Sequence, residues 1–387
     1  MIFAEPTLSR EDHKVLEILE GQRRRLRIET QHNPRRWHGV MRRSMFARAI
    51  QGSNAIEGYN ATMDEAMAAV EDEPALDERT ETSRAIGGYR AAMTCIMQAA
   101  EDPHFEWSKQ FLKGLHFMMT GFDLNAHPGT WRPGAVQVVD HATGVVVYDA
   151  PYSDLVDYLV SELVEYLDGQ NYESVVVAAA MAHLNLTLIH PFKDGNGRMA
   201  RALQTLVLAR EGLVHPLFSS IEEWLGRNTQ DYYDVLADVG QGAWNPANDA
   251  LPWVRFCLKA HYQQANTVIR RHEEYEALFS SIETLVERHR LNERMAVPLF
   301  NAAVGMRITN ARYQKETDES THVAGRDLKA LADLALLVPH GEKRGRYYTA
   351  GTALREAREA ARRSRAVRDP YELPEVSADP GPRLPGL

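Results

Sequence analysis

The chain has 387 residues, which is enough for two or three domains and at least one sizeable core. Its formal net charge of −9 excludes a surface that attracts nucleic acid as a whole. Its two cysteines, Cys95 and Cys257, sit in apolar helical patterns, so we expect buried thiols and exclude a disulfide or cysteine-metal framework. Because Ala, Leu, Arg and Glu fill the long stretches, we expect a mainly α protein.

Two segments bear on the location of the protein. The first residues, MIFAEPTLSREDHK, contain acids early and no apolar signal core, so secretion is not expected. The most apolar run, Val175 to Ile189, contains His183 and Asn185 and is too short and too polar to cross a membrane. We therefore expect a cytoplasmic protein without a membrane partner.

Helical patterns dominate the first part of the chain. They cover residues 11–50, 62–72 and 80–101. Gly52 is expected to break the first of these patterns, so that a new short segment begins at Ser53.

A β-hairpin is expected next. Two β-branched runs, at residues 135–139 and 145–148, flank a short loop that contains glycine. Helical patterns then return, and they cover residues 153–167, 172–189, 199–211, the surroundings of Tyr232 and Tyr233, and residues 252–272.

The last third has the plan of a winged helix. Three short helices are expected at residues 292–304, 310–315 and 320–334, and two strands at residues 336–338 and 346–349. The chain from about Leu354 is rich in arginine and then in proline, so we expect a disordered tail.

Residues 190–201, with the sequence HPFKDGNGRMAR, carry the chemistry. Gly195 and Gly197 let the backbone turn its N–H groups inward. A helix that begins directly afterwards adds free N–H groups and the positive end of its dipole. Together these features predict an anion cradle of the kind that binds phosphate.

Charged side chains in this loop extend the prediction to a polyphosphate with a metal ion. Arg198 and Arg201 share one helix face and suit several phosphates better than one carboxylate. Asp194 offers a hard oxygen ligand of the kind that holds Mg²⁺ together with phosphate oxygens. His190 is the group that accepts a proton near neutral pH. The alternative is a metal site of His183, His190 and Asp194, which leaves the Gly-Asn-Gly-Arg run without a role.

The loop resembles the signature of the Fic family, His-Pro-Phe-x-Asp/Glu-Gly-Asn-Gly-Arg-x-x-Arg, and fills every fixed position. The resemblance covers about residues 40–265 in helix order. It implies a protein adenylyltransferase that moves AMP from ATP to a Ser, Thr or Tyr hydroxyl of a protein and releases pyrophosphate.

The resemblance also implies a role for each loop residue. His190 would be the general base, Asp194 would hold Mg²⁺ as the cofactor, and Phe192 would face the core. The nucleotide would be bound by the loop and by the first turn of the next helix. Gly195, Asn196 and Gly197 would lie at the α-phosphate. Arg198 and Arg201 would hold the β- and γ-phosphates.

Two further segments resemble parts of Fic proteins. The hairpin at residues 135–148 falls where the family carries a flap, whose exposed strand edge would pair with the target chain. The alternative is a hairpin that only stabilises the fold.

The segment Ser53 to Gly58 resembles the inhibitory motif of the family, Ser/Thr-x-x-x-Glu-Gly/Asn. Glu57 would form a bidentate pair with Arg201 and take the place of the γ-phosphate. The alternative is a surface glutamate in a helix that ends at Gly58.

Tyr232 and Tyr233 fall where relatives contact the nucleobase, so stacking on adenine is expected. The open alternative is that both tyrosines belong to the core.

The winged-helix module has a limited basic character. Three basic residues lie in the expected wing: Lys343, Arg344 and Arg346. On the expected recognition helix, Asp327 and Asp333 offset Arg326 and Lys329. DNA binding and protein docking therefore both remain open.

The expected organisation has four parts: an N-terminal helical region at 1–105 with the inhibitory motif at 53–58, a catalytic core at 106–265 with the flap at 135–148 and the loop at 190–201, a linker helix and winged helix at 266–353, and a tail at 354–387. The expected function is an autoinhibited protein adenylyltransferase that uses ATP, modifies a protein target or itself, and has the capacity to dimerise. The alternatives are a de-AMPylating hydrolase and a DNA-binding regulator with a nucleotide-sensing core.

Overall fold

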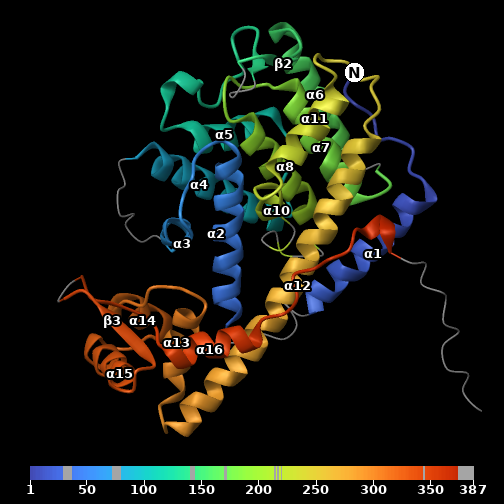
Figure 1. The fold of residues 1–387 in the computed structure, drawn as a ribbon. Helices are drawn as coiled ribbons and strands as arrows, with labels where there is room; N and C mark the ends of the chain where they lie inside the picture. Colours follow the sequence, from blue (N-terminus) through green and yellow to red (C-terminus); the bar gives the residue numbers. More distant parts are fainter. Residues whose placement is uncertain are drawn as a thin grey trace, which may run out of the picture.

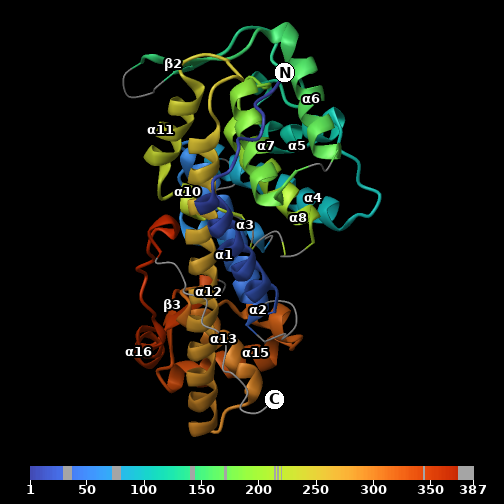
Figure 2. The same ribbon diagram turned by 90° about the vertical axis from the view of Figure 1, so that its right-hand side faces the viewer.

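The computed structural model describes residues 1–28, 37–71, 80–139, 144–169, 172–212, 215, 218, 220–342 and 345–373. The fold is mainly helical, as the composition predicts. The longest helix, α12, is Leu251–Arg288, and it runs from the upper body to the lower, C-terminal module (Figures 1 and 2). Among the described residues, no helix combines the length and apolar character needed to cross a membrane.

A pair of helices forms the centre of the upper body. Helix α7 (Val175–Ile189) packs along α8 (Asn196–Arg210), and nearly every side chain of both is buried. Ser174 caps α7 by accepting a hydrogen bond from Val176 N at 3.2 Å. The helix expected at residues 172–189 is therefore confirmed, and the loop between α7 and α8 is fixed at both ends.

Other helices surround this pair. The first group precedes it in the chain: α4 (Glu81–Glu101), α5 (Lys109–Thr120), the 3₁₀ turn η2 (Leu124–Ala126), the 3₁₀ turn η3 (Ser153–Leu155) and α6 (Val156–Gly169). The second group follows it: α10 (Glu222–Leu225) and α11 (Thr229–Gly240). Contacts of α4, α6 and α12 with the central pair close the core.

The N-terminal segment is attached to this body. Helix α1 (Arg10–Arg27) begins with a capping box in which Ser9 and Asp12 bond reciprocally, and it packs along α12. Asn185 of α7 binds both backbone groups of Phe3, at 2.8 and 3.0 Å. The polar residue that interrupts the apolar α7 sequence therefore holds the start of the chain.

Helix α2 (His38–Ile56) does not stop at Gly52, so the predicted break there is wrong. The helix continues because Gly52 packs directly against the backbone of Glu222 in α10, where a Cβ would collide with the Glu222 carbonyl oxygen. Gly226 faces the same contact, and its added Cβ would lie 2.8 Å from Gly52 Cα. The glycine thus allows a close helix approach, and the helix ends only at Ile56, two residues before Gly58, which has a φ of 84°.

The expected hairpin is present. Strand β1 (Gln137–Val139) pairs antiparallel with β2 (Val146–Asp149). The loop residues 140–143 lie outside the described residues. The hairpin projects at the top of the body, near the chain start and α11 (Figure 1).

The C-terminal module has the expected order of three helices and two strands. Its elements are the turn η4 (Glu293–Met295), α13 (Ala296–Ala303), α14 (Asn310–Thr317), α15 (Thr321–Asp333), β3 (Leu337–His340) and β4 (Tyr347–Ala350). The two strands are antiparallel, and Ile308 bridges to Tyr348 of β4. Helix α3 (Met63–Val70) packs beside α2, above this module in the view of Figure 1. The winged-helix assignment stays a prediction.

The expected disordered tail is wrong for the part of it that the structure describes. Residues after β4 form helix α16 (Thr352–Ala361), which packs on α12 and α13. The chain then runs back to α1, where η6 (Pro370–Glu372) packs and the Tyr371 hydroxyl donates to Asp12 at 3.0 Å. Leu354 and Pro370 are buried, so apolar burial outweighs the arginine-rich composition. The prediction for residues 374–387 lies outside the described residues.

Candidate functional site

His190 ends helix α7 in a left-handed conformation, with a φ of 51°. The proline that follows disfavours a helical conformation at this residue. His190 Nδ1 lies 3.1 Å from the carbonyl oxygen of Thr187. Because a carbonyl only accepts hydrogen bonds, Nδ1 carries the ring proton and Nε2 is left as the acceptor.

Burial also favours the basic form of this histidine. It lowers the pKa of His190 below its usual value, and the charge of Arg132 acts in the same direction. The bond to Thr187 and the charges of Glu57 and Asp194 oppose this shift without cancelling it. At neutral pH the ring is therefore uncharged and able to accept a proton.

The loop after His190 is closed by its own asparagine. Asn196 Oδ1 accepts from Phe192 N at 2.9 Å, and Asn196 Nδ2 donates to Phe192 O at 2.9 Å. The Asn196 amide therefore holds the loop in shape, and only the Asn196 backbone N–H is left for the anion cradle. Phe192 is fully buried, as expected.

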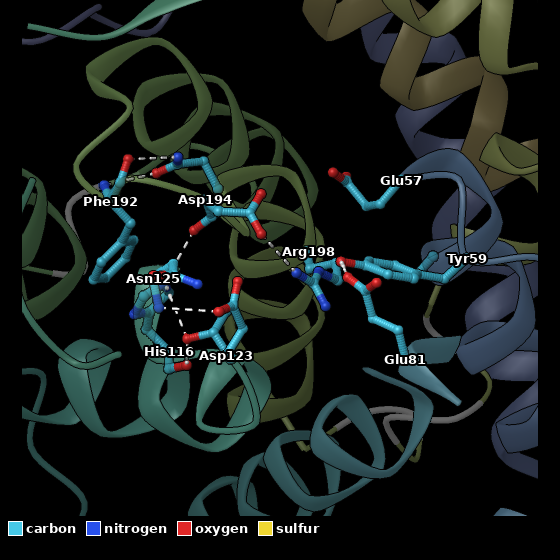
Figure 3. Close-up of polar contacts among 12 residues, drawn as sticks. Glu57, Tyr59, Glu81, His116, Asp123, Asn125, Phe192, Asp194 and Arg198 are labelled. Carbon is cyan, nitrogen blue, oxygen red and sulfur yellow. Dashed lines mark hydrogen bonds and ion pairs between the residues drawn. The ribbon is translucent and has the colours of Figure 1, made fainter. Parts of the chain in front are cut away.

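His116 of α5 supports the loop from below, a role that the sequence does not reveal. Its ring stacks on Phe192 with centroids 3.8 Å apart. Its Nδ1 accepts from Gly129 N at 2.9 Å, and its Nε2 donates to the carbonyl oxygen of Asp194 at 3.0 Å (Figure 3). Burial lowers the pKa of His116 to about 4, so the ring stays neutral and keeps both bonds.

The anion cradle forms at the start of α8. Gly195 has a φ of 77°, and no side chain caps the helix among the described residues. The first backbone N–H groups of α8 therefore have no intrahelical partner. A Cβ at Gly197 would lie 3.1 Å from Arg201 Nη1, so a glycine is needed for close approach.

Two buried arginines face this cradle. Arg198 and Arg201 are each 1% exposed. Nε and Nη1 of Arg198, and Nη1 of Arg201, bond to no partner within the described parts of the chain. Buried guanidinium nitrogens without partners are costly, and phosphate oxygens would satisfy them.

The segment Ser53 to Gly58, at the end of α2, binds Arg201. Arg201 Nε donates to Ser53 Oγ at 2.8 Å, and Nη2 donates to Ser53 O at 3.0 Å. Nη2 also donates to Glu57 Oε1 at 2.7 Å. The predicted bidentate pair with Glu57 is wrong, because Ser53 takes part of the guanidinium and leaves Glu57 one bond.

The Glu57 carboxylate lies over the helix start. A Cβ on Gly197 would collide with Glu57 Oε1, so this carboxylate is in contact with the first turn of α8. Burial raises the pKa of Glu57, but Arg201 and Arg198 outweigh it and hold this pKa below its usual value. The ionised carboxylate thus lies where the helix dipole and both arginines favour an anion. Glu57 is also the residue that follows α2. Its position at the end of the helix, which the alternative predicted, is therefore compatible with its contact to Arg201.

Tyr59 covers the second arginine. The Arg198 guanidinium lies 5.1 Å from the centroid of the Tyr59 ring, within the range of a cation–π contact. The Tyr59 hydroxyl donates to Glu81 at 3.3 Å. Figure 3 shows Glu57 and Tyr59 approaching Arg198 from one side, with Asp194 and Phe192 on the other.

A magnesium ion fits this site through one protein ligand. The Asp194 side chain is 54% exposed, and its only ionic contact among the described residues is to Arg198 at 3.5 Å. In the described part of the chain, no three His, Cys, Asp or Glu side chains gather as metal ligands. One carboxylate completed by phosphate oxygens is a usual arrangement for Mg²⁺.

The flap is anchored beside His190. Arg132 is buried, donates to His190 O at 2.8 Å from Nε, and donates to Gly134 O at 2.7 Å. The Tyr148 hydroxyl of β2 donates to Leu188 O at 2.8 Å. The outer residues of both strands are exposed. The structure thus places a hairpin with open strand residues next to the histidine.

The two tyrosines of α11 differ from one another. Tyr232 is 1% exposed, and its hydroxyl lies 3.0 Å from His183 Nε2, which favours the core alternative for Tyr232. Tyr233 is 46% exposed and donates to Ile56 O at 3.0 Å, beside Glu57. A nucleobase contact stays a prediction, with Tyr233 as the accessible residue.

His183 does not take part in a metal site. Its Nδ1 bonds to Gln204 Oε1 and its Nε2 to Tyr232, so both ring nitrogens are engaged. The alternative metal site with His190 and Asp194 is not formed within the described residues.

The basic residues of the C-terminal module are only partly described. Asp327 of α15 is buried and accepts from Arg294 Nε at 2.7 Å, and it also lies 3.6 Å from Arg326 Nε, so it offsets the charge of Arg326 as expected. Lys343 and Arg344 lie outside the described residues. DNA binding stays a prediction.

Comparisons with known proteins agree with this site. Residues 106–208 match the model of the Fic/DOC family. Protein adenylyltransferase fic-1 of Caenorhabditis briggsae is 34% identical over 108 residues, which is 27% of this chain and 19% of the relative. Protein adenylyltransferase Fic of Nematostella vectensis is 31% identical over 139 residues, 35% of this chain and 28% of the relative. The chain therefore spans less than a third of the length of these curated relatives.

Solved structures share the fold. A Fic family protein from Desulfovibrio desulfuricans G20 is 22% identical, with a TM-score of 0.59 over 90% of this chain and 99% of that chain. Fic-1 from C. elegans is 25% identical, with a TM-score of 0.51 over 67% of this chain and 72% of that chain.

The fold and the loop define a helical protein with a phosphate-binding cradle between two core helices. Residues 106–208, which include this loop, are similar to the Fic/DOC family.

Proposed function

We propose that the protein is an autoinhibited protein adenylyltransferase that transfers AMP from ATP to a Ser, Thr or Tyr hydroxyl of a protein. The observation that carries this proposal is the contact of Glu57 with Arg201 over the start of α8. The loop there has a base, a cradle and two buried arginines, and its relatives are named protein adenylyltransferases.

The transfer step uses the residues of the loop. His190 Nε2 accepts the proton of the target hydroxyl, and the hydroxyl oxygen forms a bond to the α-phosphorus of ATP. The bond from the α-phosphorus to the bridging oxygen breaks, and pyrophosphate leaves with that electron pair. The free N–H groups at the start of α8 stabilise the charge on the α-phosphate. Arg198 and Arg201 hold the outer phosphates.

Magnesium belongs to the same proposal. Asp194 would hold the ion, which would supply positive charge to the phosphates of ATP. The flap would align the target chain by strand pairing, and the backbone of β1 or β2 would provide the hydrogen bonds.

Autoinhibition is expected because the Glu57 carboxylate and the outer phosphates of ATP would bind to the same arginine, Arg201. Glu57 holds Arg201 and lies against Gly197, where a phosphate would otherwise approach. While Glu57 is there, the outer phosphates cannot bond to Arg201 as the transfer requires. Removal of the Glu57 carboxylate should therefore increase transfer.

The experiment measures label from α-³²P-ATP in protein in the presence of Mg²⁺. We expect weak labelling by the wild type, strong labelling by Glu57→Gly, and none by Glu57→Gly with His190→Ala. Asn60→Gly is the matched control, because it loosens the same exposed loop and keeps the carboxylate. An inactive Glu57→Gly that still binds ATP would refute the proposal.

A further inference from the structure

A cleft of about 570 Å³ lies between the inhibitory helix and the C-terminal module. Its upper side is formed by α2 and α3, and its lower side by the residues around α13, α14, β4 and α16. In Figure 1, α3 faces the module across this region. The volume falls in the range of small-molecule sites, which is about 300–1,000 Å³.

The cleft is rich in arginine. Five arginines line it, from both sides: Arg48, Arg307, Arg312, Arg346 and Arg358. The lining includes two acids, and both are engaged locally. Asp64 pairs with one of these arginines, Arg307, at 3.1 Å, and Arg312 pairs with Glu71, whereas Arg346 and Arg358 have no carboxylate partner among the described residues. Glu65 accepts from the backbone and hydroxyl of Thr62 in a capping box. The lining therefore favours an anion.

Arg48 contributes charge that its surroundings do not balance. Its nearest carboxylate is Glu223, at 3.6 Å. Glu223 already accepts from Arg271 at 2.9 and 3.0 Å and from Arg227 at 2.5 Å. Arg48 Nε is buried and bonds to no partner among the described residues. Burial and the charge of Arg271 lower the pKa of Arg48, which an added anion would reverse.

The cleft also has an apolar side. Met63 and Met67 of α3 face it from above, and Val304 and Met306 face it from the C-terminal module. The Tyr347 ring also lines it. Methionine-rich walls adapt to flat apolar groups. The combination suits a ligand with one anionic and one flat apolar part.

We propose that this cleft binds a nucleotide-sized organic phosphate and that its occupation weakens the inhibitory contact of Glu57. The second half of this statement depends on the proposed function; the first half does not.

A direct connection links the cleft to Glu57. Gln51 of α2 lines the cleft, and its Nε2 donates to Ala61 O at 2.8 Å. This bond fixes the end of loop 57–62 to α2. The loop leads from Glu57 to the start of α3. A ligand that contacts Gln51 and the α3 side chains competes with this bond. Glu57 lies within the same loop, so a shift of the loop moves its carboxylate away from Arg201.

The binding test uses AMP, GMP, UMP and citrate with the full chain, measured by titration calorimetry. Arg346 is exposed and has no hydrogen bond or ion pair among the described residues, so Arg346→Glu should leave the fold intact. The matched control is Arg365→Glu, which reverses the charge of another exposed arginine outside the cleft. We expect at least one nucleotide to bind, and to bind about tenfold or more weakly to Arg346→Glu than to the control.

Equal affinities in both variants would place the nucleotide elsewhere, for example in the catalytic loop, and would overturn the proposal. The same holds if no nucleotide binds, or if citrate binds as well as the nucleotides.

The regulatory test measures transfer from ATP with and without the nucleotide that binds. We expect the wild type to become several-fold faster and Glu57→Gly to stay unchanged, because its inhibitory carboxylate is absent. Binding without acceleration of the wild type would overturn the regulatory half. If Glu57→Gly transfers no AMP at all, the proposed function fails, and the calorimetric result still decides the cleft.

Discussion

Ser53 and Arg201 are joined by two hydrogen bonds, one from Nε to the hydroxyl at 2.8 Å and one from Nη2 to the carbonyl oxygen at 3.0 Å. Both partners are fully buried. Ser53 thereby fixes the orientation of the guanidinium that Glu57 meets. The serine and the glutamate of the inhibitory motif act on one side chain, four residues apart at the end of one helix.

We therefore expect Ser53→Ala to increase AMP transfer, but less than Glu57→Gly does. It removes the hydroxyl bond and leaves the carbonyl bond and the ion pair. A buried hydrogen bond to a charged group contributes about 1.5–3 kcal/mol. In Ser53→Ala, part of this free energy is recovered because the freed Arg201 Nε binds phosphate better. Transfer from labelled ATP measures the effect, with Ser161→Ala, a partly exposed serine of α6, as control. Unchanged transfer in Ser53→Ala would show that Glu57 holds Arg201 without help.

Tyr59 should contribute to inhibition through Arg198. Tyr59→Ala removes the ring that lies 5.1 Å from the guanidinium and should increase transfer about two- to fivefold, as expected for loss of a cation–π contact of about 0.5–1 kcal/mol. Tyr59→Phe keeps the ring and loses only the bond to Glu81, so it should resemble the wild type. Similar transfer by the alanine and phenylalanine variants would show that the ring has no inhibitory effect.

The catalytic loop was largely predictable because its parts are consecutive in sequence. Two glycines, a helix start and charged residues at helical spacing imply an anion cradle without knowledge of the tertiary fold. The contact of Glu57 with Arg201 bridges 144 positions of the chain. It was predicted only through the resemblance of Ser53 to Gly58 to a known motif.

The supporting contacts were not predictable in this way. His116 and Tyr59 meet the loop only because α5 and the end of α2 pack beside it, and neither residue has a local pattern that indicates a site. Gly52 suggested a helix break, yet its lack of a side chain serves close packing against Glu222. Asn196 is expected at the α-phosphate, and the sequence does not reveal that its side-chain amide bonds to the backbone of Phe192.

The pH dependence of transfer should report the burial of His190. Its pKa lies below the usual value of about 6.5, and the neutral ring is the proton acceptor. The rate of Glu57→Gly should therefore stay level from pH 8 to pH 6.5 and fall only at lower pH, where the ring gains a proton. Initial rates at saturating ATP measure this profile. A fall that already begins above pH 7 would contradict a buried neutral base.

Stability should decrease in acid because two core histidines are neutral in the folded protein. His183 and His261 bond to opposite ends of the Gln204 amide, and burial lowers the pKa of each to about 3. In the unfolded chain both titrate near 6.5. The unfolded state thus binds more protons between these values. The contribution of both histidines to stability is fully present above pH 6.5 and is lost as the pH falls towards 3.

Glu222 acts in the opposite direction. Burial raises its pKa to about 7, above the unfolded value of about 4.5, so its contribution grows as the pH falls between these values. Between its folded and unfolded pKa values, each group changes the free energy of unfolding by about 1.4 kcal/mol per pH unit. His116, whose pKa burial lowers to about 4, adds to the effect of His183 and His261, so three histidines against one glutamate leave a net loss of stability as the pH falls from 6.5 to 4.5. Denaturant unfolding at several pH values measures this slope. Glu222→Gln removes the opposing group, so its slope should be steeper than that of the wild type, and a slope equal to that of the wild type would contradict this account.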